Sequence, residues 1–157
     1  MASRQDRFFQ AVAARQIPRI RVAGIVVQDD AVLVQRPRDE AEACYAFIGG
    51  EYEVGDSFAT RLAQEFEEET TARLVSSTYA FCVENRFLYN GQMIQQVEHY
   101  FFVDLDRRTV ESREPHLSQH WLPRADLGAY DLRPHVVRDL LAEGRHRDVR
   151  HLVQGVD

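Results

Sequence analysis

Apolar and polar positions along the chain predict helices near both ends and in the middle, with strands between them. In residues 3–16, Phe8, Phe9 and Val12 recur on one side of a helix that has to stop before Pro18. Residues 133–144, RPHVVRDLLAEG, predict a second amphipathic helix, with Val136, Val137, Leu140 and Leu141 facing inward and Gly144 ending it.

The strand signals lie on either side of the mid-chain helix. Residues 19–37 predict two strands joined by a turn at Asp29-Asp30, and the first is apolar on both faces, which is typical of the middle of a sheet. Residues 72–105 predict a long hairpin closed at Asn90-Gly91, a strong hairpin signal. Residues 116–123 add one more strand. The expected class is α/β, with a mixed sheet between helical layers.

Composition narrows the class of protein. A chain of 157 residues with 45% apolar residues is expected to form one globular domain. Its longest apolar runs fall far short of the roughly 20 residues that a membrane span needs, and the charged N-terminus is unlike a signal peptide. Cys44 and Cys82 have neither metal-site nor disulfide-scaffold spacing, so we expect reduced thiols in a cytoplasmic protein.

Charge excludes several kinds of active site and partner. The net charge is −6, and all 19 of the positive residues are arginines. Without lysine, the chain has no Schiff-base lysine, no Ser-Lys dyad and no lysine-bearing phosphate loop. The overall acidity also argues against a nucleic-acid partner, because duplex binding depends on a positive surface.

The mid-chain helix carries an unusual run of glutamates. Asp56 or Ser57 is expected to cap a helix that runs to about Thr70, with an apolar stripe made by Ala59, Leu62, Ala63 and Phe66. Glu65, Glu68 and Glu69 share an arc of about 100° beside that stripe. The helix dipole disfavours each of them by roughly 0.3–1 kcal/mol. No basic residue stands at i+4 of Glu65 or Glu68 to offset this repulsion.

Two explanations fit this acidic run. An acidic helix face is usually just solvated, and a purely structural acidic domain stays an alternative. The glycines before the helix, Gly49-Gly50 in an expected loop and Gly55, favour a site instead, because glycine lets backbone approach a ligand closely. Clustered carboxylates select hard cations such as Mg²⁺ or Mn²⁺.

The stretch from Gly49 to Val75 resembles the signature of the Nudix (MutT-like) hydrolases, G-x5-E-x7-R-E-U-x-E-E-x-G-U, where U is aliphatic. Gly50, Glu65, Phe66 and Glu68-Glu69 match the signature, and Gly49, Glu53 and Gly55 fit the glycine-rich opening that many members share. The resemblance extends over about residues 21–143. It implies a Nudix-type α/β/α sandwich with a mixed β-sheet between helices, divided into an N-terminal helical extension (1–17), a core (18–143) and a C-terminal tail (144–157).

Three positions depart from this signature. Asp56 stands for Glu, Gln64 for Arg and Thr71 for Gly. In the family the arginine orients the neighbouring glutamate, whereas Gln64 offers only a neutral bond, so Glu65 is expected to be held more loosely. Thr71 is expected to cost about 1–2 kcal/mol if the left-handed helix end is kept.

The resemblance implies a divalent-metal-dependent hydrolase that cleaves the pyrophosphate bond of a nucleoside diphosphate linked to another group, releasing a nucleoside monophosphate. The resemblance implies that the metal ligands are Glu65, Glu68, Glu69 and the Gly50 carbonyl, and that the general base is Glu65, Glu69 or Glu98. The implied phosphate-binding residues are Arg21, Arg36 and Arg86. The residues that would support the signature segment, called the Nudix box, are Gly49, Glu53, Asp56 and Gln64. Mg²⁺ or Mn²⁺ is the expected cofactor and a small nucleotide the expected partner, and a homodimer is compatible with the family. The departures leave open a non-catalytic or weakly active nucleotide-sensing module.

Overall fold

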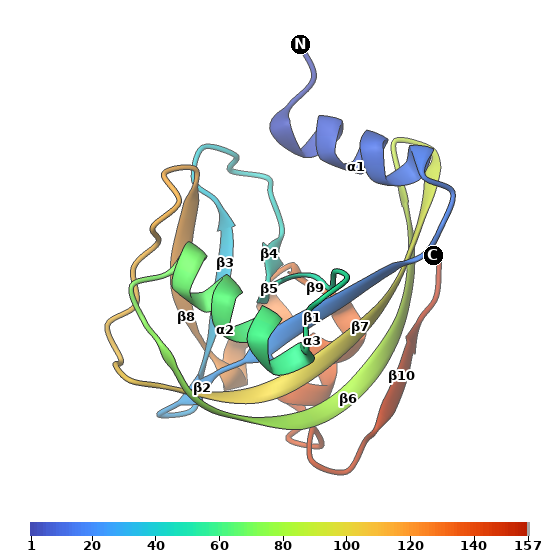
Figure 1. Ribbon diagram of the computed structural model, residues 1–157. Coiled ribbons are helices and arrows are strands. Elements are labelled where there is room, and N and C mark those ends of the chain that lie inside the picture. The colour runs from blue at the N-terminus through green and yellow to red at the C-terminus, as the bar shows by residue number, and fades with distance from the viewer. Residues whose placement is uncertain (157) are drawn as a thin grey trace.

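The computed structural model describes residues 1–156, which form three α-helices, one 3₁₀ helix and ten strands (Figure 1). In chain order these elements are α1 (Arg4–Ala14), β1 (Arg19–Ile25), β2 (Val27–Gln28), β3 (Ala31–Pro37), β4 (Tyr45–Ala46), β5 (Ile48–Glu51), α2 (Phe58–Glu69), β6 (Leu74–Tyr89), β7 (Gln92–Leu105), β8 (Leu117–Pro123), η1 (Arg124–Ala129), β9 (Leu132–Arg133), α3 (His135–Ala142) and β10 (His151–Gln154).

The strands form two mixed sheets. The first has the order β10-β6-β7-β1-β5, in which β1 pairs in parallel with β7 and antiparallel with β5. The second has the order β2-β3-β4-β9, and β8 also pairs with β3. The expected central position of the first strand is therefore confirmed, while the single expected sheet is divided in two.

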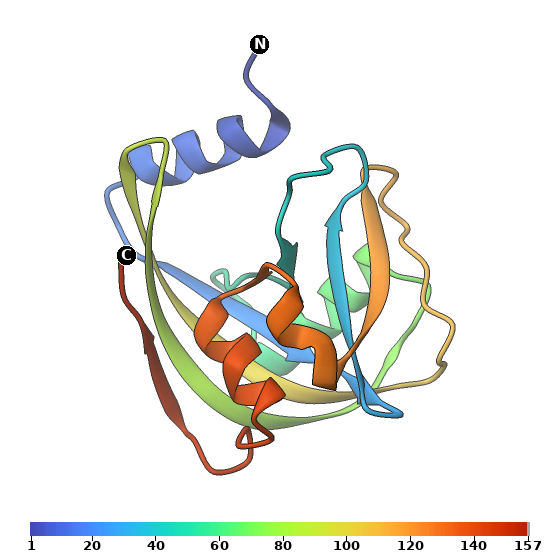
Figure 2. The ribbon, with the colours of Figure 1, turned by 180° about the vertical axis from the view of Figure 1, so that it is seen from behind.

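Alternation along β1 separates the two layers of the core. Val22 belongs to a buried cluster that includes Leu62 and Phe66 of α2, whereas Ala23 and Ile25 belong to a cluster completed by α3. Figure 1 shows α2 on the near side of β1, and Figure 2 shows α3 on the opposite side. The architecture is thus the expected α/β/α sandwich, with mixed sheets between helices.

Both predicted turns adopt the backbone that their residues favour. Asp29 and Asp30 have φ of 47° and 60°, and Asn90 and Gly91 have φ of 49° and 77°. Positive φ at both central residues matches the twist of antiparallel strands, so these turns fix the register of β2 on β3 and of β6 on β7.

The two ends of the chain pack against the first sheet. Ser3 caps α1 through a capping box with Asp6, and Val12 and Ala13 pack on Ile94 near the tip of the β6–β7 hairpin. The segment 144–157, expected as a tail, contains β10, which pairs in parallel with β6. No helix in residues 1–156 is long and apolar enough to cross a membrane.

Candidate functional site

The acidic helix α2 begins at a capping box. Ser57 Oγ accepts a bond from the Thr60 amide at 3.1 Å, and Thr60 Oγ1 accepts one from the Ser57 amide at 2.9 Å. Ser57 rather than Asp56 is therefore the N-cap. Leu62 and Phe66 are fully buried and fix the rotation of the helix. Ala59 and Ala63, expected in the apolar stripe, are exposed.

Gly49 and Gly50 lie in strand β5 and not in the expected loop. A Cβ on Gly49 would stand 2.2 Å from the carbonyl oxygen of Val22, so the pairing with β1 excludes any side chain there. A Cβ on Gly50 would stand 2.0 Å from Glu65 Oε1. The carboxylate of Glu65 therefore lies directly against the Cα of Gly50, and this is the contact between strand β5 and the acidic helix α2.

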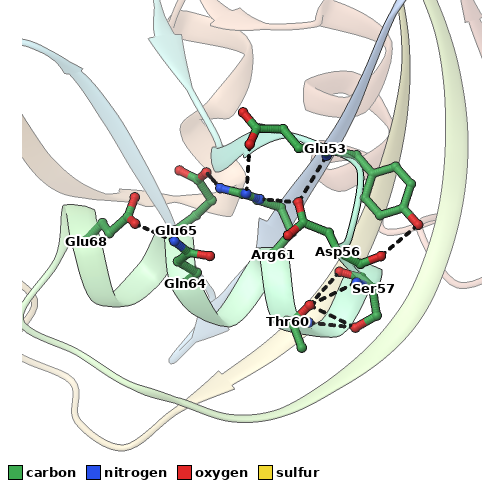
Figure 3. Close-up of polar contacts among 9 residues, drawn as sticks. Glu53, Asp56, Ser57, Thr60, Arg61, Gln64, Glu65 and Glu68 are labelled. Atoms are coloured by element: carbon green, nitrogen blue, oxygen red, sulfur yellow. Dashed lines mark hydrogen bonds and ion pairs between the residues drawn. The ribbon is translucent and has the colours of Figure 1, made fainter.

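Arg61 joins the loop before α2 to Glu65 (Figure 3). Its Nε donates to Asp56 Oδ2 at 2.7 Å, its Nη1 donates to Glu65 Oε1 at 3.2 Å, and its Nη2 lies 3.4 Å from Glu53 Oε2. The bond from Arg61 is the largest cause that lowers the pKa of Asp56. The expectation of a loosely held Glu65 is wrong, because a guanidinium one turn earlier supplies a charge-assisted bond.

Gln64 has a different partner from the one expected. Its Nε2 donates to Glu68 Oε1 at 2.8 Å and makes no bond to Glu65 (Figure 3). Gln64 and Glu68 are both exposed. The residue that replaces the arginine of the signature thus steadies the second glutamate of the helix instead of the first.

Glu69 is held from the other sheet. Gln35 of β3 donates to Glu69 Oε2 at 3.1 Å, and Gln119 of β8 donates to Gln35 Oε1 at 3.0 Å. Burial, and to a lesser extent the charge of Glu65, raise the pKa of Glu69 to about 7, although the bond from Gln35 acts in the opposite direction. The pKa of Glu65 is also raised, first by burial and then by the charge of Glu68. Glu65 is therefore repelled by both of the other carboxylates, Glu68 and Glu69.

The end of α2 is built without a left-handed residue. Thr70 is fully buried, and its hydroxyl donates to the carbonyl of Phe66 at 2.7 Å and accepts from the Ala72 amide at 3.2 Å. Across residues 1–156, positive φ at non-glycine residues occurs at positions 16, 29, 30 and 90. Thr71 is not among these positions, so the left-handed helix end is not kept and the strain that it would have imposed on Thr71 does not arise. Its amide instead bonds the carbonyl of Glu111 at 3.0 Å.

The NUDIX domain family matches residues 18–143 of this chain. The chain belongs to the NUDIX family. No curated protein matches it.

Solved NUDIX structures share the fold at low sequence identity. The MutT NUDIX hydrolase of Burkholderia pseudomallei superposes with a TM-score of 0.63 at 21% identity, covering 80% of this chain and 96% of that one. The MutT protein of Methanosarcina mazei gives 0.65 at 20% identity, covering 83% and 95%. The NUDIX domain of Shewanella oneidensis NrtR, crystallised with ADP ribose, gives 0.65 at 14% identity, covering 85% and 90%. The prediction of a Nudix-type pyrophosphohydrolase is confirmed at the level of the family.

Nudix hydrolases generally use divalent metals, and the residues of this box fit such an ion. All the candidate side-chain ligands are carboxylates, which suit hard cations, and Gly50, which has no side chain, lets strand β5 lie against the Glu65 carboxylate. Within residues 1–156, however, no three acidic, histidine or cysteine side chains converge closely enough to hold one ion. Arg61, Gln64 and Gln35 each hold one of the three glutamates, so an arriving cation has to compete with these bonds.

Glu98, expected on a solvent-facing position of its strand if it is not a base, is 1% exposed. Its carboxylate accepts bonds from Tyr100 at 2.6 Å, Asn85 at 2.7 Å and Gln96 at 3.0 Å. The guanidinium of Arg21 lies 3.6 Å from Glu98 Oε1. The structure therefore buries Glu98 in a polar network that ends at Arg21.

The three arginines proposed for phosphate binding have different surroundings. Burial raises the pKa of Glu65 and Glu69, and the positive charge of Arg21 is near enough to both carboxylates to offset part of that rise. The guanidinium of Arg36 lies over the ring of Tyr45, 5.0 Å from its centroid. Arg86 is exposed on the half of β6 nearest the hairpin turn, and within residues 1–156 it forms no ion pair. The structure thus brings Arg21, and not Arg86, to the Nudix helix.

Two residues that hold glutamates of α2 are absent from the predicted site. Arg61 stands four residues before Glu65, a spacing at which side chains meet on a helix, so the helical period indicates this contact. Gln35 reaches Glu69 from β3, and no local pattern in the sequence indicates this contact.

Proposed function

We propose that this protein cleaves the pyrophosphate bond of a nucleoside diphosphate linked to another moiety, and that it releases a nucleoside monophosphate with the help of Mg²⁺ or Mn²⁺. The observation that carries the proposal is the carboxylate of Glu65, which rests on Gly50 with Glu68 and Glu69 beside it on the same helix. Mutual repulsion of these groups favours the binding of a cation at this point.

Glu65, Glu68, Glu69 and the Gly50 carbonyl are the proposed ligands. The bound ion would polarise the pyrophosphate and lower the pKa of the attacking water. The chain itself has to orient the substrate and to accept the proton of that water. Glu65 and Glu69 are our candidates for the proton acceptor, because Arg61 and Gln35 hold their carboxylates in place.

Arg21 and Arg36 are the proposed phosphate ligands. Arg21 lies beside the acidic helix, where a guanidinium can bind two phosphate oxygens at once. Glu98 was also a candidate base, but its burial and its bonds support another role, which is to hold Arg21. Arg36 is stacked on Tyr45, which restricts its motion and leaves its charge available.

Our proposal favours the enzyme over the sensing alternative. That alternative depended on Asp56, Gln64 and Thr71, whereas Arg61 supplies a charge-assisted bond to Glu65 and Thr70 ends the helix without a left-handed residue. The complex of the NrtR NUDIX domain with ADP ribose makes nucleoside diphosphate sugars the first compounds to test. A homodimer and a cytoplasmic location stay predictions.

The test is a panel of NDP-sugars, ADP-ribose, dinucleoside polyphosphates and NTPs with Mg²⁺ or Mn²⁺, with nucleotide products separated by chromatography. We expect metal-dependent release of a nucleoside monophosphate from at least one NDP-linked compound. Glu68→Gln should abolish it, while Glu67→Gln, an exposed residue of the same helix, is the matched control. Nucleotide binding without turnover by the unmodified protein would support the sensor and overturn the proposal.

A further inference from the structure

Arg61 holds the loop and the helix of the Nudix box together. Its side chain is 12% exposed, and those of its partners Asp56 and Glu65 are 15% and 13% exposed. We propose that Arg61 is the residue that positions Glu65, in place of the arginine that the signature puts at position 64. This inference rests on the proposed function, in which Glu65 acts at the reacting phosphate.

The placement of Arg61 is poor for stabilising a helix, so its ion pairs need another explanation. Arg61 is the fourth residue of α2, where the positive end of the helix dipole disfavours a cation. An ion pair on a helix is also weaker when the arginine precedes the glutamate by four residues than when the glutamate precedes the arginine. What the placement does achieve is a guanidinium that reaches Asp56 on one side and Glu65 on the other.

Two departures from the signature fit together in this arrangement. Asp56 Oδ2 accepts from the Glu53 amide at 3.0 Å and from Arg61 Nε at 2.7 Å, so the short carboxylate is anchored to its own loop. Asp56 and Arg61 together therefore fix the guanidinium, and its remaining Nη1 faces Glu65.

The result is a carboxylate held from two sides. The Cα of Gly50 lies against Glu65, and Arg61 Nη1 binds Glu65 Oε1 at 3.2 Å. Gln64 is then free to hold Glu68, to which its Nε2 donates at 2.8 Å. Arg61 thus holds Glu65 in the place of the signature arginine, and Gln64 holds Glu68.

A cycle of three variants tests the positioning role: Arg61→Ala, Gln64→Arg, and the two combined. We expect Arg61→Ala to lower kcat by about 10- to 100-fold with KM changed less than about threefold, as the loss of one charge-assisted bond to a reacting group implies. Gln64→Arg should recover about tenfold or more of kcat in the Arg61→Ala background and much less in the wild-type chain. Arg73→Ala removes an exposed arginine of the neighbouring segment and serves as the control.

A second readout does not depend on turnover. Crystal structures of the metal-free proteins should show the Glu65 carboxylate over Gly50 in the wild type and in the double variant, and displaced in Arg61→Ala. A purely structural Arg61 would lower the melting temperature without moving Glu65, and Gln64→Arg would not restore kcat; that result overturns the inference.

If the wild type hydrolyses nothing in the panel, the proposed function fails, and the position of Glu65 still decides the role of Arg61. If Arg61→Ala does not fold, Arg61→Lys is the second variant, because lysine keeps the positive charge but lacks the planar guanidinium that can bond two carboxylates at once. It should show a displaced Glu65 and a kcat reduced about tenfold. An unmoved Glu65 with wild-type kcat would contradict the inference.

Discussion

Replacing Gly50 by alanine probes the contact between β5 and the acidic helix. The added Cβ would stand 2.0 Å from Glu65 Oε1 and 2.2 Å from its Cδ, whereas ordinary contacts begin at 3.4 Å. The carboxylate therefore has to retreat by about 1.4 Å, and a displacement of about 1 Å at a reacting group costs about 100-fold in rate. We expect kcat of Gly50→Ala to fall by that factor on whichever compound of the panel is cleaved.

The protein should still fold, because the clash is with the end of a side chain and not with backbone. We expect the free energy of unfolding in urea to fall by about 1.5–3 kcal/mol, the value of one hydrogen bond to a charged group. Gly128→Ala is the control, since a Cβ there meets nothing within 4 Å and its φ is not positive. A Gly50→Ala protein that folds and keeps kcat within about twofold of wild type would refute the reasoning.

Three substitutions test the supports around the box by urea unfolding. Thr70→Val removes a buried hydroxyl that bonds Phe66 and Ala72, so stability should fall by about 1–3 kcal/mol, and a loss below about 0.5 kcal/mol would contradict this account of the helix end. Thr71→Gly should not stabilise the protein, because Thr71 is not left-handed; a gain of about 1 kcal/mol would show that strain was present after all. Glu98→Gln should cost about 1.5–3 kcal/mol, since an amide cannot accept bonds on both of its ends, and unchanged stability would argue against the buried network.

The elements with local signals were predictable from the sequence. Asn90-Gly91 specifies its own turn, and apolar residues on both faces of residues 22–27 placed β1 inside a sheet, because such local preferences need no knowledge of distant neighbours. β5 and β10 were missed. β5 is a strand only because Gly49 and Gly50 pair with β1, and β10 only because it lies alongside β6. Pairing across long sequence separations determines such short strands, and their own residues do not.

The same distinction between local and long-range signals applies to the candidate site. The glutamates of α2 and the glycine beneath Glu65 could be found from spacing, because one helix and one signature carry them. The bonds of Glu98 and Gln35 could not, because Gln35 of β3 reaches Glu69 of α2 from 34 residues away, and the bond between Asn85 of β6 and Glu98 of β7 depends on how those strands pack. Arg61 is the intermediate case: its spacing to Glu65 is local, but its bond to Asp56 depends on how the loop folds back over the helix.

The central claim is that the glutamates of α2 gather around a hard dication next to Gly50. Anomalous diffraction from a crystal soaked in manganese tests it most directly. The account predicts a peak bounded by Glu65, Glu68, Glu69 and the Gly50 carbonyl, with Glu68 turned away from Gln64. No peak at that point, with Glu68 still bound to Gln64, would contradict it.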